Sequence, residues 1–158
     1  MSIHIHNQPS PDVLQAIPHR PPFLFVDRII EEHPDCIVTE RTIRSDENYF
    51  QGHYPNNPIM PGVLLCESVF QTGAILLSHR IIKENAGESQ KTPVLARIIE
   101  AKFKAMVRPG DTIQIEAQYM ESIGQFHRLK GTIRKEGKVC VTLECLLAMV
   151  DSDKATSS

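Results

Sequence analysis

The sequence predicts an α+β fold in which one antiparallel sheet wraps round a single long, buried helix. Three observations support this prediction: two strand-like segments come first, an apolar helical segment follows, and four strand-like segments complete the chain. Strands and helices that alternate in blocks rather than one by one are typical of the α+β class. At 158 residues the chain is expected to form one domain, residues 1–158, with residues 151–158 as a frayed tail.

The N-terminal part predicts a short helix and then two strands. Residues 10–12, SPD, combine an N-cap, a proline at the first helical position and an acidic first turn, and the helix should end before Pro18. FLFVDRIIE at 23–31 and CIVTERTIR at 36–44 predict strands joined by a turn. Three charged residues here are interpreted as a structural ion-pair cluster: Arg20, Asp27 and Arg28.

Residues 45–61 predict a long loop containing Gly52 and three prolines, and a long irregular segment in a compact domain is commonly functional. Residues 62–84 then predict a helix without internal proline. Its first five turns are apolar on nearly every side, which indicates a buried helix. Gly73 costs such a helix about 1 kcal/mol relative to alanine, and so suggests close packing at that point.

The last part of the chain predicts four strands separated by glycine-containing turns. The second alternates cleanly, with Ile113, Ile115 and Ala117 on one face. One helix and one sheet leave sheet edges and a helix flank uncovered, which suggests a dimer. Lys102 and Lys104 would share one strand face, suited equally to an acidic partner and to solvent. The four predicted strands cover residues 94–107, 112–120, 126–134 and 139–150.

Composition excludes several classes of protein. A net charge of −2 provides no overall basic field, which argues against a nucleic-acid binder. No apolar run reaches the roughly 20 residues of a membrane span, and the N-terminus lacks the features of a signal peptide. The four cysteines form no C-x-x-C pair, which favours reduced thiols in the cytoplasm. The seven histidines show no metal-ligand spacing, and we interpret His4 and His6 as part of a mobile terminus, so no metal is expected.

The stretch GHYPNNPIMPGVLLCESVFQ at 52–71 contains the candidate chemistry. Glu67 lies in an apolar run, and a buried carboxylate must be paired, neutralised or in use. His53 has the residue type of a general base, and Gly62 opens the helix, where backbone N–H groups and the positive end of the dipole meet. Gln71 lies one turn beyond Glu67 and could hydrogen-bond it. Each residue alone has a structural interpretation, but their combination at this spacing favours a site.

Three segments resemble the motif regions of the β-hydroxyacyl-acyl carrier protein dehydratase family (the FabZ type), in the same order. They are PHRPPFLFVDRI at 18–29, YFQGHYPNNPIMPGVLLCESVFQ at 49–71 and KFKAMVRPGD at 102–111. The resemblance implies a hot-dog fold and a cytoplasmic lyase of fatty acid biosynthesis that needs no cofactor. It would dehydrate (3R)-3-hydroxyacyl-acyl carrier protein to the trans-2-enoyl product.

The resemblance also implies roles for three residues. His53 matches the catalytic base, and Glu67 matches the carboxylate that acts as acid or orients water. Gly62 matches the residue whose N–H binds the thioester carbonyl. Beside these, three further residues are candidates for contact with substrate: Val63, Gln71 and Phe50, of which Phe50 suits a core position better.

The implied partners are acyl carrier protein and further copies of the chain, as a homodimer or a trimer of such dimers. In the resembling family the histidine of one protomer faces the carboxylate of the other. Two alternative functions stay open at this point: a hot-dog acyl thioesterase and a non-catalytic acyl-binding paralogue. A relative that also isomerises its product is less favoured, because such members have aspartate at the position of Glu67.

Overall fold

The computed structural model describes residues 8–84 and 91–152, and its elements follow the predicted order. The predictions for His4, His6, the helix end at 85–87 and residues 153–158 lie outside the described residues. The elements are α1 (Pro11–Ala16), β1 (Arg28–His33), β2 (Cys36–Thr42), a 3₁₀ helix (Asn48–Gln51), α2 (Gly62–Glu84), β3 (Lys91–Phe103), β4 (Thr112–Ile123), β5 (Phe126–Lys135) and β6 (Lys138–Asp151).

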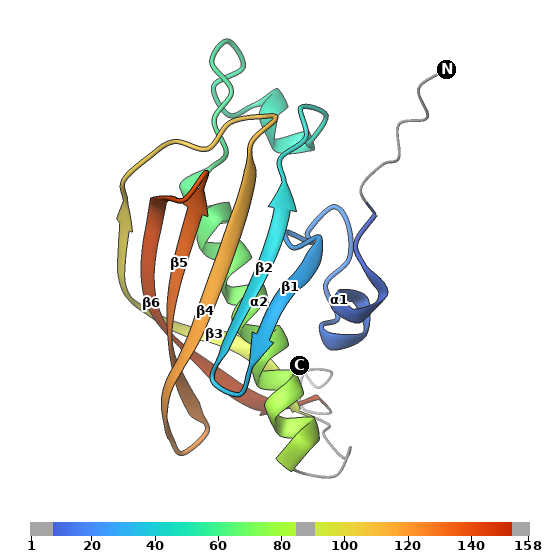
Figure 1. Cartoon of the computed structure of the whole chain (residues 1–158), viewed down its shortest axis with the longest axis vertical. Helices are drawn as coiled ribbons and strands as arrows, with labels where there is room; N and C mark the ends of the chain where they lie inside the picture. The colour runs from blue at the N-terminus through green and yellow to red at the C-terminus, as the bar shows by residue number, and fades with distance from the viewer. Residues whose placement is uncertain (1–7, 85–90, 153–158) are drawn as a thin grey trace, which may run out of the picture.

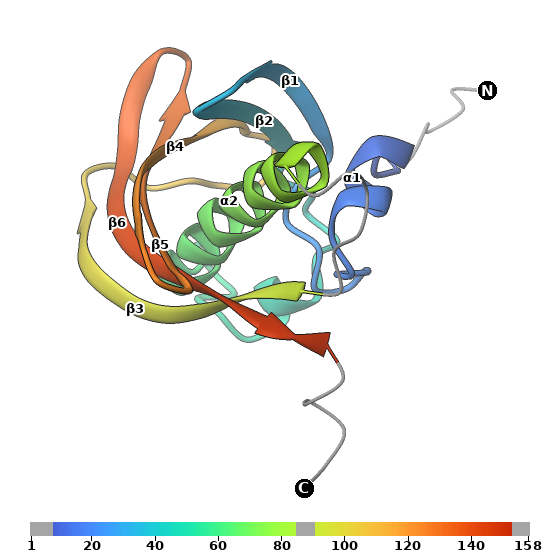
Figure 2. The ribbon, with the colours of Figure 1, turned by 90° about the horizontal axis from the view of Figure 1, so that it is seen from below.

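The strands form one six-stranded antiparallel sheet in the order β1-β2-β4-β5-β6-β3 (Figure 1). Figure 2 shows the sheet curving round α2, with α1 on the side that the sheet leaves open. α1 contacts both α2 and β1 there. The predicted α+β arrangement is therefore confirmed, and β1 and β3 are the two edges of the sheet.

The central helix α2 has the predicted bounds and forms the core. It begins directly after Pro61, whose carbonyl accepts the Leu65 N–H at 3.1 Å. By length and composition alone α2 could cross a membrane, contrary to the expectation that no segment is long and apolar enough. However, 67% of its most apolar stretch is buried inside this fold, as expected for a core helix.

Two glycines let α2 lie close to β5. A Cβ on Gly73 would be 2.6 Å from Leu129 Cδ1, so the close packing predicted for this position is confirmed. Across the same interface, a Cβ on Gly131 of β5 would be 2.2 Å from Val69 Cγ1. A Cβ at Gly73 would require the end of the Leu129 side chain to move, whereas a Cβ at Gly131 would meet the stiff Val69 side chain on the helix.

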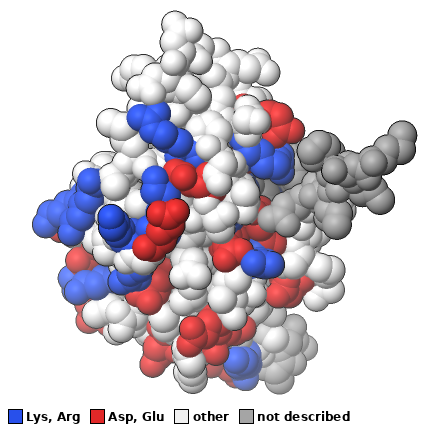
Figure 3. All heavy atoms as spheres, turned by 45° about the horizontal axis from the view of Figure 1, so that its top comes forward, with Lys and Arg blue, Asp and Glu red and all other residues white. Residues whose placement is uncertain are grey.

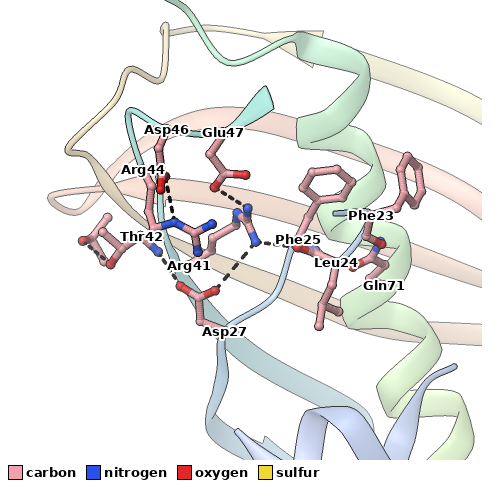
Figure 4. Close-up of polar contacts among 11 residues, drawn as sticks. Phe23, Leu24, Phe25, Asp27, Arg41, Thr42, Arg44, Asp46, Glu47 and Gln71 are labelled. Atoms are coloured by element: carbon pink, nitrogen blue, oxygen red, sulfur yellow. Dashed lines mark hydrogen bonds and ion pairs between the residues drawn. The ribbon is translucent and has the colours of Figure 1, made fainter. Parts of the chain in front are cut away.

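The first predicted strand is wrong over residues 23–27, because β1 begins only at Arg28. The backbone of that segment lies against α2, where Phe23 and Phe25 bond to a helix side chain (Figure 4). At Asp27 the backbone reaches β2, with the N–H donating to the Glu40 carbonyl at 2.9 Å. The Gln71 amide accepts the Phe25 N–H at 2.7 Å and donates to the Phe23 carbonyl at 3.2 Å. An apolar segment can therefore have its backbone satisfied outside the sheet.

The predicted ion-pair cluster is also wrong, because its three members have different partners. Arg20 donates to the backbone carbonyls of residues 14, 17 and 19, and Arg28 pairs with Glu40 on the surface. Asp27 instead accepts the Thr42 N–H at 2.8 Å and lies 3.7 Å from a buried arginine that the prediction missed.

This buried arginine is Arg41, and Figure 4 shows the contacts of its two terminal nitrogens. It pairs with Glu47 and donates to the Leu24 carbonyl at 2.6 Å. A buried charge needs such partners, because removing it from water is otherwise costly. The cluster therefore fixes the segment before β1 against β2 and the 3₁₀ helix.

Several element ends differ from the predictions. β3 ends at Phe103, and just beyond it the N–H groups of Lys104 and Ala105 both donate to the Cys140 carbonyl of β6, at 2.7 and 3.3 Å. Lys104 therefore lies just beyond the end of β3, whereas Lys102 lies within it. Asp151 still belongs to β6 and pairs with Lys91, so the frayed tail does not begin at 151. Ser10 has the extended backbone of an N-cap but makes no side-chain capping bond.

Candidate active site

His53 is held in one orientation by two hydrogen bonds. Its backbone N–H donates to the Tyr49 carbonyl of the 3₁₀ helix at 3.0 Å, and its ring Nδ1 lies 2.7 Å from the Ile59 carbonyl. Because a carbonyl oxygen can only accept, Nδ1 carries the hydrogen. In the neutral ring, Nε2 then carries the lone pair and is free to accept a proton.

The loop around His53 has no charged side chain. Residues 48–66 contain no Lys, Arg, Asp or Glu, and Figure 3 shows this end of the molecule as a largely uncharged cap. The turn is completed by Tyr54, which has a positive φ of 51° and places its ring 4.8 Å from the His53 ring. An imidazole here therefore has no neighbouring charge within its own loop.

Gly62 lies at the start of α2 beside a cavity of about 320 Å³. Among the described residues, the N–H groups of Gly62 and Val63 have no hydrogen-bond acceptor, as expected in the first turn of a helix. A Cβ on Gly62 would be 2.9 Å from Phe103 Cε1, so only glycine fits here without moving that ring. Val63 is 75% exposed. The cavity is lined by residues that include Ile59, Met60, Leu65 and Met106.

Glu67 is partly buried on α2, with 20% of its side chain exposed. The predicted hydrogen bond from Gln71 is confirmed: its Nε2 donates to Glu67 Oε1 at 3.1 Å. His19 Nε2 lies 3.7 Å from the same oxygen. Burial lowers the pKa of His19, the Glu67 carboxylate partly offsets this, and Arg20 lowers the pKa further.

Sequence reasoning missed His19 as a site residue. The sequence shows only a histidine in the loop PHRPP, with nothing to indicate that this loop touches α2. The one available signal is that His19 falls within the first of the three resembling segments, a signal that does not distinguish a site residue from a loop residue.

The six predicted site residues fall into three separate groups. His53 and Gly62 lie at the start of α2, and Ile59, which holds the His53 ring, also lines the cavity beside Gly62. At 3.6 residues per turn, Glu67 points about 140° away from Gly62 round the helix. Among the described residues no hydrogen bond or ion pair joins His53 to Glu67. Phe50 is buried in the core, with its ring 4.6 Å from that of Tyr49.

A second cavity, of about 410 Å³, lies over the buried arginine cluster. The charged groups that line it pair mainly with each other, as Arg41 does with Glu47 and Arg44 with Asp46. It therefore offers no free charge for a ligand. Within residues 8–84 and 91–152, no group of three or more His, Cys, Asp or Glu side chains has a geometry that could hold a metal ion.

Comparison with known proteins gives these residues a family context. A model of the FabA-like domain matches residues 17–144, a range that contains every candidate site residue. The chain belongs to the FabA-like family. Its relatives in this family include the protein named 3-hydroxyacyl-[acyl-carrier-protein] dehydratase FabZ of Caldicellulosiruptor saccharolyticus, which is 41% identical over 87% of this chain and 95% of the relative. The protein of the same name from Caulobacter sp. K31 is 38% identical over 90% of this chain and 86% of the relative.

Several solved structures are similar to this FabA-like chain in their fold. The dehydratase heterocomplex ApeI:P from Xenorhabdus doucetiae matches with a TM-score of 0.74 and 16% identity, over 90% of this chain and 93% of that one. The thioesterase HI1161 from Haemophilus influenzae matches with a TM-score of 0.60 and 18% identity, over 79% and 78%. These likenesses confirm the predicted hot-dog fold and, at such low identity, carry no argument about activity.

Proposed function

We propose that this chain catalyses the dehydration of (3R)-3-hydroxyacyl-acyl carrier protein to trans-2-enoyl-acyl carrier protein in fatty acid biosynthesis. The observation that carries the proposal is the likeness to proteins named as this dehydratase, which extends over most of both chains. The expected location is the cytoplasm, on the sequence grounds given above. The chemistry needs no cofactor, because water is lost without a change of oxidation state.

His53 is the proposed base. Its Nε2 lone pair would take the proton from the carbon between the thioester carbonyl and C3, and the Ile59 carbonyl would stabilise the imidazolium through Nδ1. The N–H of Gly62, together with that of Val63, would donate to the thioester oxygen as negative charge develops there. The missing Cβ of Gly62 leaves room for that close approach.

Glu67 is the residue proposed to act at C3, the carbon that carries the hydroxyl group. Either it gives a proton to the leaving hydroxyl group, or it orients the water that forms. The electron pair of the broken C–H bond becomes the new C=C bond, the C–O bond breaks, and the hydroxyl leaves as water. The apolar surroundings of Glu67 and its hydrogen bond from Gln71 support this role.

We further propose that His53 and Glu67 meet across a two-fold interface. Within the described residues no hydrogen bond or ion pair joins the two, and Glu67 points about 140° away from Gly62 round α2, which favours a partner for each from a second copy. The edge strand β3 supports a dimer, because it exposes several apolar residues: Val94, Leu95, Ile98, Ile99 and Phe103. Such an edge is normally covered by a partner. A trimer of such dimers stays open.

The proposed protein partner is acyl carrier protein, which would present the acyl thioester. Lys104 lines the cavity beside Gly62, its side chain is exposed, and it has no ion-pair partner among the described residues. Lys102 is exposed but pairs with Glu100 at 3.2 Å, and Arg108 is held by Asn57. Lys104 is therefore the cation best placed to meet an acidic carrier.

One assay separates the proposed function from its alternatives. Purified protein is incubated with a 3-hydroxyacyl-acyl carrier protein, and the carrier-bound product and free thiol are both measured. The proposal predicts loss of one water from the acyl chain without release of carrier thiol. Thiol release would identify a thioesterase, and carrier binding without turnover would identify an acyl-binding protein; either result would contradict the proposal.

A further inference from the structure

His19 touches the carboxylate to which the proposed function assigns a proton transfer. It lies between α1 and the segment that crosses α2, and its Nε2 is 3.7 Å from Glu67 Oε1. The two side chains are 27% and 20% exposed, so the contact is largely shielded from solvent. The two charged groups that act on His19 are Glu67 on α2 and its chain neighbour Arg20.

The surroundings of His19 select one form of its ring. Nδ1 is buried without a hydrogen-bond partner, so a ring with a proton on each nitrogen would leave one N–H unsatisfied. Burial and Arg20 both lower the pKa of His19, so the ring is neutral at neutral pH. The single N–H then lies on Nε2, where it faces an acceptor, because a lone pair there would face the lone pairs of the carboxylate.

Two N–H groups therefore converge on one oxygen of Glu67. Gln71 Nε2 donates to Oε1 at 3.1 Å, and the Gln71 amide is itself fixed by Phe25 and Phe23. His19 approaches the same Oε1. Oε2 receives no hydrogen bond among the described residues, so the two oxygens of the carboxyl group are distinguished before any substrate binds.

We propose that His19 is a positioning residue, which together with Gln71 holds Oε1 of Glu67 and leaves Oε2 to carry the proton exchanged with the 3-hydroxyl group. The proposal rests on the proposed function of Glu67. In the forward reaction the Oε2–H bond breaks, a new O–H bond forms on the leaving oxygen, and the α-proton goes to His53. His19 itself exchanges no proton. Its 3.7 Å contact should shorten when the acyl chain displaces water, since such bonds tighten in the substrate complex.

Replacement of His19 by glutamine, asparagine and alanine tests the proposal. The glutamine amide can place its N–H where Nε2 lies, whereas the asparagine amide reaches only the position of Nδ1. We therefore expect His19→Ala and His19→Asn to lower kcat by about 10-fold with little change in KM, the effect of one lost hydrogen bond. His19→Gln should retain most of the wild-type kcat.

His79 provides the matched control, because it belongs to the same helix as Glu67 and also faces a carboxylate. Its Nδ1 lies 2.8 Å from Glu32 Oε1, and its side chain is 24% exposed, close to the value for His19. His79→Ala should keep the wild-type kcat, because this pair lies near the other end of α2. If the removal of any half-buried histidine lowered kcat, both His19→Ala and His79→Ala would lose activity to a similar extent.

A Glu67→Gln background separates this inference from the proposed function. If His19 acts through Glu67, adding His19→Ala to Glu67→Gln should cause no further loss of kcat. A wild-type kcat in folded His19→Ala, equal kcat values for His19→Gln and His19→Asn, or a further loss in the Glu67→Gln background would each overturn it. If Glu67→Gln alone kept full activity, the proposed role of Glu67 would fail first. If His19→Ala does not fold, the comparison of His19→Gln with His19→Asn decides.

Discussion

At the scale of single residues, the two ring nitrogens of His53 have different roles. One makes a structural hydrogen bond, and the other is available for chemistry. Nδ1 ties the ring to the Ile59 carbonyl, and only Nε2 is available to a substrate. We predict that His53→Asn keeps the loop, because its amide nitrogen can occupy the position of Nδ1, yet lowers dehydration by about 10²- to 10⁴-fold. Steady-state turnover and thermal melting of this variant check the prediction. Near wild-type turnover in the folded variant would rule out His53 as the base.

His127 yields a prediction about stability and pH. Burial lowers its pKa, the positive charges of Arg80 and Lys91 lower it further, and Glu84 acts in the opposite direction. As the pH falls below about 6.5, the unfolded chain therefore takes up this proton before the folded chain does, so the free energy of unfolding decreases. His127→Gln removes this contribution.

Urea unfolding between about pH 7.5 and about pH 5.5 measures the effect. The wild type should lose stability over this range, and His127→Gln should lose less. An identical loss in both proteins would show that the folded state does not disfavour protonation of His127. His19 should contribute in the same direction, since burial lowers its pKa as well.

Individual residue types were predictable only where a local pattern identified them. The i, i+4 spacing was enough to predict the bond between Gln71 and Glu67. His19 and Arg41 were not identifiable, because their importance comes from contacts between residues distant in the sequence. His19 contacts Glu67, and Arg41 donates to the Leu24 carbonyl. A histidine in a proline-rich loop has the same local sequence whether or not it faces a carboxylate.

At the scale of elements, the contact of α2 with β5 depends on glycine. In a helix, Val69 has essentially one rotamer, so its methyl groups cannot turn away from a Cβ on Gly131. We predict that Gly131→Ala lowers the free energy of unfolding by about 1–3 kcal/mol through overpacking. Gly52→Ala is the control, because a Cβ there meets no atom within 4 Å. Equal denaturation midpoints for the two variants would contradict the close contact.

The elements themselves were predictable to different degrees. β4 was predicted from its alternation and α2 from an apolar run without proline, since both patterns are local. Residues 23–27 have the composition of a strand, but their backbone partners include a glutamine side chain on α2. That pairing depends on the position of α2 in space, which an apolar pattern does not encode. The end of β3 at Phe103 was likewise not predicted, and there two consecutive N–H groups, of Lys104 and Ala105, donate to one carbonyl of β6.

At the scale of the whole molecule, the hot-dog fold leaves the proposed site in two parts. His53 and Gly62 lie at the start of α2, whereas Glu67, Gln71 and His19 lie on another side of the helix. A two-fold axis beside the exposed β3 edge would bring one part from each protomer together, and the symmetry would create two equivalent sites. A shared site therefore behaves differently from a site within one chain when variant subunits are mixed.

Mixing the subunits of His53→Asn and Glu67→Gln proteins, each strongly impaired alone, tests whether the two residues act across the interface. In a mixed dimer one site loses both groups, and the other keeps both. With random exchange of equal amounts, half of the dimers are mixed and about a quarter of all sites are complete. The account predicts dehydration of the 3-hydroxyacyl carrier substrate at about a quarter of the wild-type rate. Verified exchange of subunits with no recovered activity would contradict it.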